Sequence, residues 1–449
     1  MTSAFSLFST LRDRIAAREA HVATVGLGYV GLPMILTIAE SGYPATGFDL
    51  NAARVADINA GKRVISYFAE DRIARAVGTG RFHATADASE LAEADVILLC
   101  VPTPLNASRE PDLSYVVRAA ETVAAHLKPG QMVVLESTVW PGATRTVIRP
   151  ILERSGLRAG VEFFLGFSPE REDPGNESYS TRDIPKVVGA DDPQSSELVD
   201  LFYSQIVART VPVSSTATAE AVKLAENSFR TVNIALVNEM KVALDAMGVD
   251  VWEVVRAAST KPFGYMPFYP GPGIGGDCIP VSPVYLSWRA RDVGSETPII
   301  DLAHTTNDHA PDTIAGRVAV ELAKRRNVQV SSARILILGV AYKKNVEDTR
   351  ESPALYILNR LEQMGALCDY HDPYFPVMPL TRDHAPLAGR KSAALTEEAV
   401  AAYDAVLVTT DHSGVDYALV ADKARLILDT RNVFDGQGIP VSGGRLVKI

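Results

Sequence analysis

The sequence has few cysteines and no long apolar run. Its three cysteines among 449 residues form no CxxC pair, so they provide neither a disulfide framework nor the spacing of a zinc site, and we assign no metal. This cysteine usage is typical of the reducing cytoplasm. No stretch reaches the ~18 uninterrupted apolar residues of a membrane span, so no membrane partner is expected. Residues 2–20 mix apolar and charged side chains, which predicts a short amphipathic helix instead of a signal peptide.

Basic surface is also scarce. The net charge of −10 argues against a nucleic-acid partner, because proteins that bind nucleic-acid phosphates carry faces rich in Lys and Arg. A local basic pocket for a small anion is still compatible with this charge. The chain of 449 residues is too long for one core, and two or three domains are expected.

One cysteine lies in a segment unlike the other two. Cys278 belongs to residues 270–280, which hold four glycines and three prolines. The backbone N–H groups of glycines can approach a ligand closely and form anion-binding nests, and such surroundings favour a thiolate. Cys278 is therefore a candidate nucleophile, with a tight structural turn as the alternative. Cys100 and Cys368 lie in apolar, strand-like runs and are expected to be small core residues.

Residues 21–33 have the pattern of a dinucleotide-binding turn. A short apolar strand leads into GLGYVGLP at 26–33, where the three glycines permit a tight turn, an approaching pyrophosphate and close helix packing. A second strand ends at Asp49, at the distance expected for gripping a ribose 2′-hydroxyl, which favours NAD over NADP. Arg54 could accept a 2′-phosphate, and a surface turn with a capping Asp is the alternative. The cofactor-binding residues predicted here are Gly26, Gly28, Tyr29, Val30, Gly31, Asp49 and Arg54.

Further strands and helices follow this turn. Apolar runs and helical stretches alternate and predict a parallel, doubly wound sheet, with strands at 96–101, 132–136 and 163–167 and helices at 70–77 and 113–126. Ligands of such sheets bind at the carboxyl ends of the strands. The polar segments at these ends contain Pro102, Thr103, Ser137, Thr138, Glu170 and Arg171. Thr138 and Glu170 are expected to face one crevice, although either alone could equally be a helix cap or a turn residue.

Residues 217–247 have the pattern of one long helix. Apolar side chains recur in steps of three and four and predict a core-facing stripe of Val222, Ala225, Phe229, Val232, Leu236, Met240, Ala243 and Met247. A helix of this length between two domains also suits a dimer contact. Lys223, Asn227 and Arg230 follow the same spacing on a neighbouring stripe. A solvated face is the usual explanation of such a polar stripe.

The α/β pattern restarts after the long helix. A second α/β sheet is predicted from strands at 334–339, 367–371 and 405–409 and a helix at 353–364. The loop at 339–350 lacks GxGxxG but holds Lys343 and Lys344, which suits a different nucleotide or phosphate ligand. Four residues near the strand ends could suggest a metal but are interpreted as strand-end and turn residues: His371, Asp372, Asp411 and His412.

Six motifs in one order resemble those of the nucleotide-sugar 6-dehydrogenases, the UDP-glucose/UDP-N-acetylhexosamine 6-dehydrogenase family. They are GLGYVGLP (26–33), ESTV (136–139), SPER (168–171), KLAEN (223–227), GGDC (275–278) and DTRESP (348–353). The match runs from about residue 21 to the C-terminus. Segments 167–176 and 270–276 are most similar to the branch that acts on UDP-N-acetylhexosamines, with UDP-N-acetylglucosamine the nearest match. UDP-N-acetylmannosamine and UDP-glucose are the alternative substrates.

This resemblance implies an α/β fold of two Rossmann-like, doubly wound domains joined by a long central helix and a helical dimerisation region. The expected domains are an NAD-binding domain at 1–213, a central domain with the cysteine loop at 214–316, and a UDP-binding domain at 317–449. The implied cofactor is NAD, the implied substrate is a UDP-sugar, and the implied assembly is a homodimer or a dimer-based oligomer.

The activity implied by the resemblance is oxidation of the sugar C6 alcohol to an acid by two hydride transfers to NAD. Cys278 would form a thiohemiacetal and then a thioester. Lys223 and Asn227 would stabilise the oxyanion, or Lys223 would accept the first proton. Glu170 would be the base for hydrolysis, with Thr138 holding a water.

Other roles are also carried over by resemblance. Arg350 is similar to the family residue that reaches the NAD pyrophosphate, and residues 265–274 look like the loop that wraps the sugar diphosphate. Arg256 is a candidate for the Arg that a neighbouring subunit contributes in this family. The substrate-binding residues implied are Glu170, Arg171, Lys223, Asn227, Arg230, Tyr269, Gly273, Gly275 and Lys343.

The chain departs from the family beside the nucleophile. Four residues after Cys278 the family normally has Asp, and this chain has Ser282; directly before it, where Ser or His is usual, the chain has Asp277. A simple exchange of roles is not expected, because a misplacement of ~1 Å can cost ~100-fold in rate. We therefore expect a working dehydrogenase with altered hydrolysis or pH dependence. The alternatives are a nucleotide-sugar-binding protein that has lost oxidation, and a two-domain NAD-dependent dehydrogenase without covalent catalysis.

Overall fold

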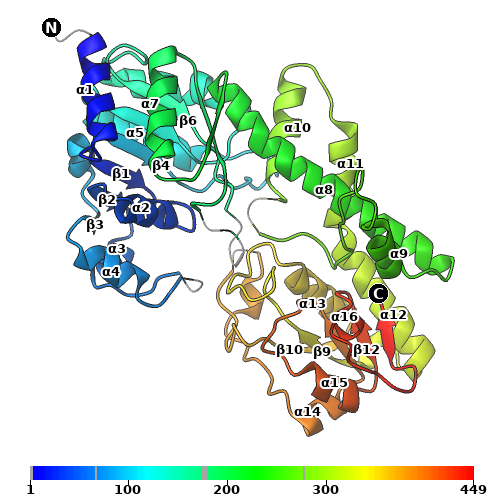
Figure 1. Ribbon diagram of the computed structural model, residues 1–449. Coiled ribbons are helices and arrows are strands. Elements are labelled where there is room, and N and C mark those ends of the chain that lie inside the picture. Colours follow the sequence, from blue (N-terminus) through cyan, green and yellow to red (C-terminus); the bar gives the residue numbers. More distant parts are fainter. Residues whose placement is uncertain (1–3, 66–67, 173–178, 180, 277–278, 382) are drawn as a thin grey trace. The chain divides into compact units, whose positions relative to one another are not determined.

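The computed structural model describes residues 4–65, 68–172, 179, 181–276, 279–381 and 383–449. The chain forms two compact units (Figure 1). Unit 1 consists of Met1–Glu226 and Val284–Glu296, and unit 2 of Asn227–Pro283 and Thr297–Ile449. The three-domain division drawn from the sequence stays a prediction.

Unit 1 is built on one twisted sheet. Its described residues form eight strands in the order β3-β2-β1-β4-β5-β6-β7-β8. The strands are β1 (Val22–Val25), β2 (Ala45–Phe48), β3 (Phe82–Thr85), β4 (Val96–Leu99), β5 (Met132–Leu135), β6 (Phe164–Phe167), β7 (Lys186–Ala190) and β8 (Thr210–Val213). The first six are parallel to one another, whereas β7 runs antiparallel to β6. The reversal of order at β1 and β4 makes a topological switch point, where ligands of such sheets bind.

Helices cover this sheet. Their apolar faces share one core with the strands; Phe8, Leu11 and Ile15, for example, pack from the first helix. The helices of unit 1 are α1 (Ala4–Ala16), α2 (Gly31–Glu40), α3 (Ala52–Asn59), α4 (Arg72–Gly78), η1 (Ala88–Glu93), α5 (Ser114–His126), η2 (Thr144–Ile148), α6 (Arg149–Leu152), η3 (Glu153–Ser155) and α7 (Pro193–Ser204). The predicted N-terminal helix and parallel, doubly wound core are thus confirmed.

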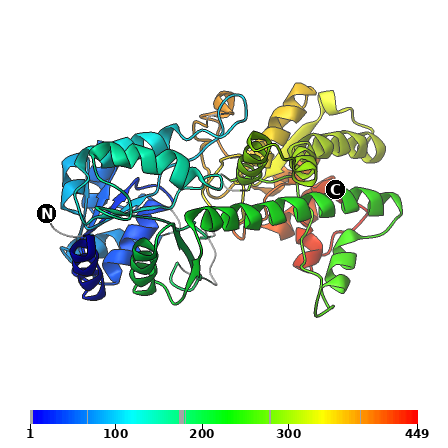
Figure 2. The same cartoon turned by 90° about the horizontal axis from the view of Figure 1, so that it is seen from above.

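Two helices belong partly to each unit, α8 (Thr216–Ala246) and α10 (Ser282–Asp292). Figure 2 shows α8 as one unbroken helix, as its sequence pattern predicted. The predicted core-facing stripe is wrong, however: none of its eight residues is buried, and Phe229, Leu236 and Met247 are 49%, 53% and 72% exposed. The buried face instead combines apolar side chains such as Leu224 with the polar side chains of Lys223, Asn227 and other residues.

Unit 2 holds the second α/β sheet. Its described residues form five parallel strands in the order β10-β9-β11-β12-β13. The strands are β9 (Arg334–Leu338), β10 (Leu367–His371), β11 (Ala405–Val408), β12 (Ile427–Asp429) and β13 (Leu446–Lys448). The helices are α9 (Val251–Ala258), α11 (Pro298–Asp308), α12 (Ala310–Arg326), η4 (Val330–Ser332), α13 (Pro353–Gln363), η5 (Ala385–Leu387), α14 (Glu397–Ala402), α15 (Tyr417–Lys423) and α16 (Val433–Gly436). The second predicted sheet, and with it the α/β fold class, is confirmed. Among the described residues, no helix combines the length and apolarity needed to cross a membrane.

Candidate active site

The glycine turn between β1 and α2 gives each of its glycines a different environment. Gly26 has φ +95°, and a Cβ there would lie 2.6 Å from the Cys100 carbonyl oxygen. A Cβ on Gly31 would lie 1.9 Å from the Gly26 carbonyl oxygen. Around Gly28, in contrast, no atom lies within 4 Å of the Cβ position. Close packing therefore requires the first and third glycines, and the second faces open space that a pyrophosphate can enter.

Two side chains, Asp49 directly after β2 and Arg54 of α3, are tied to this turn. The Asp49 carboxylate accepts hydrogen bonds from the backbone N–H groups of Leu27 and Asn51, both at 2.9 Å. The Arg54 side chain donates to the Leu27 carbonyl oxygen at 2.7 Å. Asp49 is thus hydrogen-bonded to the turn that holds the open position at Gly28, an arrangement that fits the ribose and pyrophosphate of NAD.

The loops after β4 and β5 are joined through Ser137. Its hydroxyl accepts from the Val101 N–H at 2.9 Å and donates to the Val101 carbonyl oxygen at 2.8 Å. Pro102 is exposed, and Thr103 and Thr138 are half-buried beside this junction. The predicted cofactor residues of both loops therefore meet at the carboxyl edge of the sheet.

A buried charged cluster follows the ends of β5 and β6. Lys186 Nζ lies 3.0 Å from Glu136 Oε2 and 3.3 Å from Glu170 Oε2. The Tyr203 hydroxyl donates to the other Glu136 oxygen. The register that pairs Phe167 with Gly189, continued by three residues, sets Lys186 opposite Glu170. The antiparallel strand β7 is therefore what brings the lysine to the carboxyl edge.

This cluster controls the ionisation of its carboxyl groups. Burial alone would raise the pKa of Glu170, but Lys186, the Glu172 N–H and Lys223 together hold that pKa below its usual value. Burial raises the pKa of Glu136 against the pull of Lys186. Although burial disfavours its charge, Glu136 and Glu170 raise the pKa of Lys186. Glu170 is thus a carboxylate available as a proton acceptor at neutral pH.

Lys223 lies next to Glu170. It is buried, and its Nζ donates to the Glu170 carbonyl oxygen at 2.5 Å. Arg171 is held by Glu226 Oε1 at 2.6 Å and by the Pro185 carbonyl oxygen at 2.6 Å. The structure therefore brings the predicted residues Glu170, Arg171 and Lys223 together within unit 1, and the solvated-face interpretation is wrong for Lys223.

A neighbouring glutamate gives a testable pH effect. Burial and the adjacent charge of Glu170 raise the pKa of Glu172 to about 8, against the opposing charges of Lys186 and Arg72. Between the unfolded pKa of about 4.3 and the folded value, the folded protein keeps the Glu172 proton and the unfolded chain has released it. The free energy of unfolding therefore falls as the pH rises through this window. Glu172→Gln should remove this loss: in urea unfolding, the variant should gain about 3 kcal/mol on the wild type between pH 6 and pH 9. Parallel stability curves for the two proteins would contradict the expectation.

In unit 2, Asn227 and Ser282 contact each other. The Asn227 Nδ2 donates to the Ser282 Oγ at 2.8 Å, and both side chains are buried. The next turn of α8 continues the contact, because Thr231 Oγ1 donates to the Ile279 carbonyl oxygen at 3.4 Å. The residue that replaces the family Asp therefore holds a predicted catalytic amide. Asp277 and Cys278 lie outside the described residues.

The glycine loop before Cys278 packs on the loop after β9. A Cβ on Gly275 would lie 2.6 Å from the Tyr342 Cβ, and the Gly276 N–H donates to the Arg350 carbonyl oxygen at 3.0 Å. Gly273 has φ +138° and lies against Pro353. Unit 2 thus brings the predicted residues Gly273 and Gly275 beside the loop that carries Lys343 and Arg350.

Other predicted residues have different surroundings. The Arg350 guanidinium pairs with Asp348 at 2.6 Å, and the Tyr269 ring stacks on Trp252 at 5.4 Å. Arg230 and Arg256 are exposed.

The carboxyl end of β10 has a structural role. His412 and Asp372 form a buried pair at 3.1 Å, and Asp372 Oδ2 also accepts from the Val340 N–H at 2.7 Å. Within the described ranges, no group of three or more His, Cys, Asp or Glu side chains is arranged to hold a metal ion.

Sequence reasoning missed two cations. Lys186 opens an otherwise apolar strand, and a charge in such a run is the signal that could have identified it. Arg431 lies against the glycine loop, where a Cβ on Gly271 would lie 2.8 Å from its Nη1. Its Nε donates to the Thr409 carbonyl oxygen at 3.0 Å. Both are cations held close to predicted site residues.

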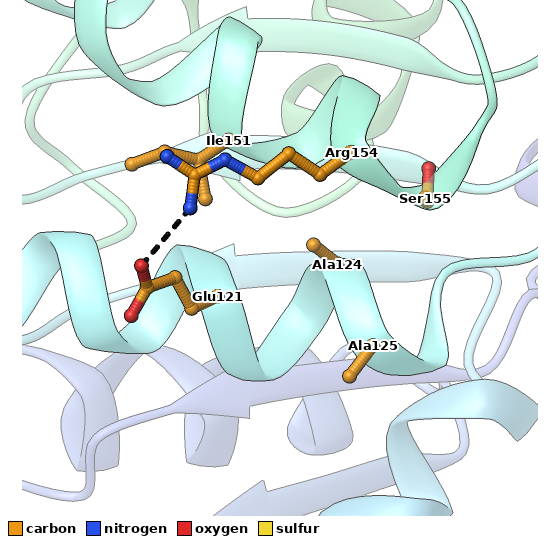
Figure 3. A pocket seen from close by; sticks show the side chains of 6 residues that line it. All are labelled: Glu121, Ala124, Ala125, Ile151, Arg154 and Ser155. Atoms are coloured by element: carbon orange, nitrogen blue, oxygen red, sulfur yellow. Dashed lines mark hydrogen bonds and ion pairs between the residues drawn. The ribbon is translucent and has the colours of Figure 1, made fainter.

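A surface hollow lies elsewhere in unit 1. It is lined by Glu121, Ala124 and Ala125 of α5, Ile151 of α6, and Arg154 and Ser155 of η3 (Figure 3). Arg154 closes one side through an ion pair of 3.1 Å with Glu121. Its three α5 residues lie in the second half of that helix, which returns toward the amino edge of the sheet, so the hollow is not part of the candidate site.

Comparison with known proteins gives one family for three parts of the chain. The UDP-glucose/GDP-mannose dehydrogenase family models match residues 20–207 (NAD binding domain), 217–309 (central domain) and 336–436 (UDP binding domain). A UDP-N-acetyl-D-glucosamine 6-dehydrogenase of Pseudomonas aeruginosa is 37% identical over 80% of this chain and 83% of its own length. A Salmonella typhi protein of the same name is 33% identical over 88% of this chain and 90% of its own length. The solved structure of a UDP-D-ManNAc dehydrogenase from Pyrococcus horikoshii has a TM-score of 0.85 at 32% identity, and the match covers 95% of this chain and 98% of that one.

Proposed function

The chain belongs to the UDP-glucose/GDP-mannose dehydrogenase family and is an NAD-dependent nucleotide-sugar 6-dehydrogenase, and on this premise we propose that its substrate is UDP-N-acetylglucosamine. The predicted family, enzyme class and cofactor are thereby confirmed. The substrate proposal is supported by the 37% identity to a protein named for that sugar and by the similarity of segments 167–176 and 270–276. Relatives are also named for UDP-N-acetyl-D-mannosamine, so that epimer is the first competitor, followed by UDP-glucose.

The proposed cofactor site is the switch point of the unit 1 sheet. When bound there, NAD would supply the acceptor for the hydride that leaves the sugar C6 in each of the two oxidations. The pyrophosphate lies at the open position beside Gly28, and the Asp49 carboxylate accepts hydrogen bonds from the ribose hydroxyls. Ser137 keeps Thr103 and Thr138 beside the same edge through its hydrogen bonds to Val101.

The chemical steps are assigned to this chain's own groups. After the first oxidation, the Cys278 thiol adds to the C6 aldehyde to give a thiohemiacetal, which loses the second hydride to become a thioester. Lys223 and Asn227, one turn apart on α8, donate to the oxygen that becomes negative. Glu170 then takes a proton from water as the water attacks the thioester, the carbon–sulfur bond breaks, and the acid and the Cys278 thiolate are released.

One observation carries this assignment: the Glu170 carboxylate is buried against Lys186 while Lys223 donates to the carbonyl oxygen of the same residue. A proton acceptor and an oxyanion donor are thereby fixed beside each other. Because Ser282 offers Asn227 a hydroxyl where the family has a carboxylate, we assign proton removal from water to Glu170. We therefore propose that hydrolysis in this enzyme depends more on pH than oxidation does.

The proposed assembly is a homodimer. Five of the eight residues of the predicted apolar stripe of α8 are exposed in the chain, among them Phe229, Leu236 and Met247, which are about half or more accessible. Exposed apolar patches rimmed by polar residues mark protein interfaces, and a second copy would cover this one. Arg256, exposed on α9, is proposed to reach the partner's substrate. We place the reaction in the cytoplasm, where the Cys278 thiol stays reduced.

Substrate binding in unit 2 is assigned to the loop after β9. Lys343 is proposed to bind the UDP moiety, and the glycine loop with Tyr269 the sugar diphosphate. Their support is the packing of Gly275 and Gly276 on the segment from Tyr342 to Arg350. The domain limits expected from the sequence, 1–213, 214–316 and 317–449, are kept as part of this proposal.

The test is to incubate the purified protein with NAD and a panel of UDP-sugars, to count NADH formed per sugar consumed and to identify the product by mass. Two NADH per UDP-N-acetylglucosamine, with a uronic acid product, support the proposal. Faster turnover of UDP-N-acetylmannosamine or UDP-glucose would reassign the substrate. Sugar binding without any NADH would identify a binding protein that has lost oxidation.

A further inference from the structure

Four ionisable side chains form a buried row in unit 1: Tyr203, Glu136, Lys186 and Glu170. The side chains of Glu136, Lys186 and Glu170 are 0%, 5% and 13% exposed. The row runs through the hydrogen bond from Tyr203 to Glu136 and the two ion pairs of Lys186. The chemical steps above give no role of their own to Glu136 or Lys186, although Lys186 contacts the proton acceptor Glu170 and Glu136 contacts Lys186.

Such a row of buried charges adds little to the stability of the fold. Buried ion pairs can usually be replaced by well-packed apolar side chains at no loss of stability, because removing charges from water offsets their attraction. The row is therefore poorly explained by packing alone. Its end is functional: one Glu170 oxygen accepts from the N–H groups of Arg171 and Glu172, at 2.7 and 2.6 Å, and the other faces Lys186. Both oxygens of the proton acceptor thus have fixed partners.

We propose that Lys186 and Glu136 are positioning residues for Glu170: Lys186 holds the carboxylate in one orientation and balances its buried charge, and Glu136, backed by Tyr203, holds Lys186. This inference rests on the proposed role of Glu170 in hydrolysis.

The second carboxylate of the row, that of Glu136, has a role during turnover. When Glu170 takes the proton of the attacking water, its charge disappears while Lys186 remains a buried cation. Glu136 still pairs with Lys186 at that moment, so the cluster contains no unpaired charge, which would be costly. The proton then passes from Glu170 to the departing Cys278 thiolate, and the row returns to its starting state.

The effect should be visible in the pH dependence of hydrolysis. The ionisable groups that face or influence Glu170 are Lys186, Glu136, Tyr203, Cys100, Glu172, Arg171 and Lys223. Lys186 supplies the nearest positive charge to the Glu170 oxygens. Without it, burial is less opposed, so Glu170 should become protonated at a higher pH and hydrolysis should need more alkaline conditions.

The test follows hydrolysis separately from oxidation in Lys186→Met, with UDP-N-acetylglucosamine and NAD. We expect the rapid first NADH formation and the Kd for the sugar, measured without NAD, to change little, whereas the KM should fall together with kcat because the thioester accumulates. The steady-state rate at pH 7 should fall roughly tenfold or more and recover toward pH 9. A sugar thioester should accumulate on Cys278 by intact mass. Lys186→Arg should restore most of the rate, and Lys128→Met, which removes an exposed lysine paired with Glu93, should behave as wild type.

A double variant separates positioning from charge balance. Lys186→Met with Glu136→Gln removes one charge of each sign and also covers the case in which Lys186→Met alone fails to fold. We expect slow hydrolysis in the double variant as well, because Glu170 still lacks the positive charge of Lys186. Recovery of the wild-type rate and pH profile, or an equal loss of oxidation and hydrolysis, would overturn it. A wild-type protein that forms no uronic acid would instead overturn the proposed function itself.

Discussion

Replacing Cys278 with alanine is expected to reduce uronic acid formation about a thousandfold or more, as removal of a covalent nucleophile does in other enzymes. The aldehyde would no longer be captured, so NADH formation should stop near one equivalent per sugar, with free aldehyde in solution. The measurement is NADH counted against sugar consumed, with the aldehyde trapped by a hydrazine and identified by mass. Acid formation at the wild-type rate would favour a dehydrogenase without covalent catalysis.

The other two cysteines are the controls for this experiment. Both are buried, as predicted. Burial raises the pKa of Cys100 well above its usual value and raises that of Cys368 to about 12. Thiols of this kind are poor nucleophiles. Cys368→Ala should therefore keep two NADH per sugar and lose only stability, by about 1 kcal/mol, and slow alkylation by iodoacetamide should label Cys278 first.

The sequence predicted the elements whose patterns are local. Strands such as β1, β4 and β9 are continuous apolar runs bounded by turn residues, and α8 has a clear period of three and four. Five strands were missed, β3, β7, β8, β12 and β13, and the last four lack these signals. β7 begins with a lysine, and β8 is an edge strand with Pro212 and no fully buried residue. β12 and β13 are three residues long. Short strands of this kind depend on the neighbours that they pair with, not on their own composition.

Some residues of the candidate site could likewise be predicted from the sequence, and others could not. Motif glycines, Asp49, Glu170, Lys223 and Asn227 could be identified because their type and spacing carry the chemistry. The Glu136–Lys186 pair could not, since it joins residues 50 positions apart through the order of β5, β6 and β7. The prediction of which face of α8 is buried was also wrong, for a physical reason. An apolar stripe on a helix can pack against the core of its own chain or against a partner subunit. The period of three and four residues is the same in both cases, so it does not distinguish them.

Gly31 and Gly28 of the turn at 26–31 should respond to substitution in different ways, which tests the cofactor site directly. Gly31→Ala forces a Cβ to within 1.9 Å of the Gly26 carbonyl oxygen and 3.0 Å of the Cys100 Cβ, in backbone and core that cannot move aside. We expect a loss of about 3 kcal/mol of unfolding free energy, because overpacking of this kind displaces α2 from β1. NAD binding should be lost with it.

Gly28→Ala is the matched variant, since it adds the same methyl group three residues earlier in the same turn. Its Cβ meets no atom within 4 Å and its φ is not positive, so the free protein should unfold at the wild-type urea concentration. The methyl group would, however, occupy the space that the pyrophosphate needs. We expect the Kd for NAD, measured by calorimetry, to rise roughly tenfold to a hundredfold while the Kd for UDP is unchanged, which corresponds to about 1.4 to 2.7 kcal/mol of binding free energy. Unaltered NAD affinity in Gly28→Ala would mean that the pyrophosphate does not approach this turn, and the cofactor site would have to be sought elsewhere on the sheet edge.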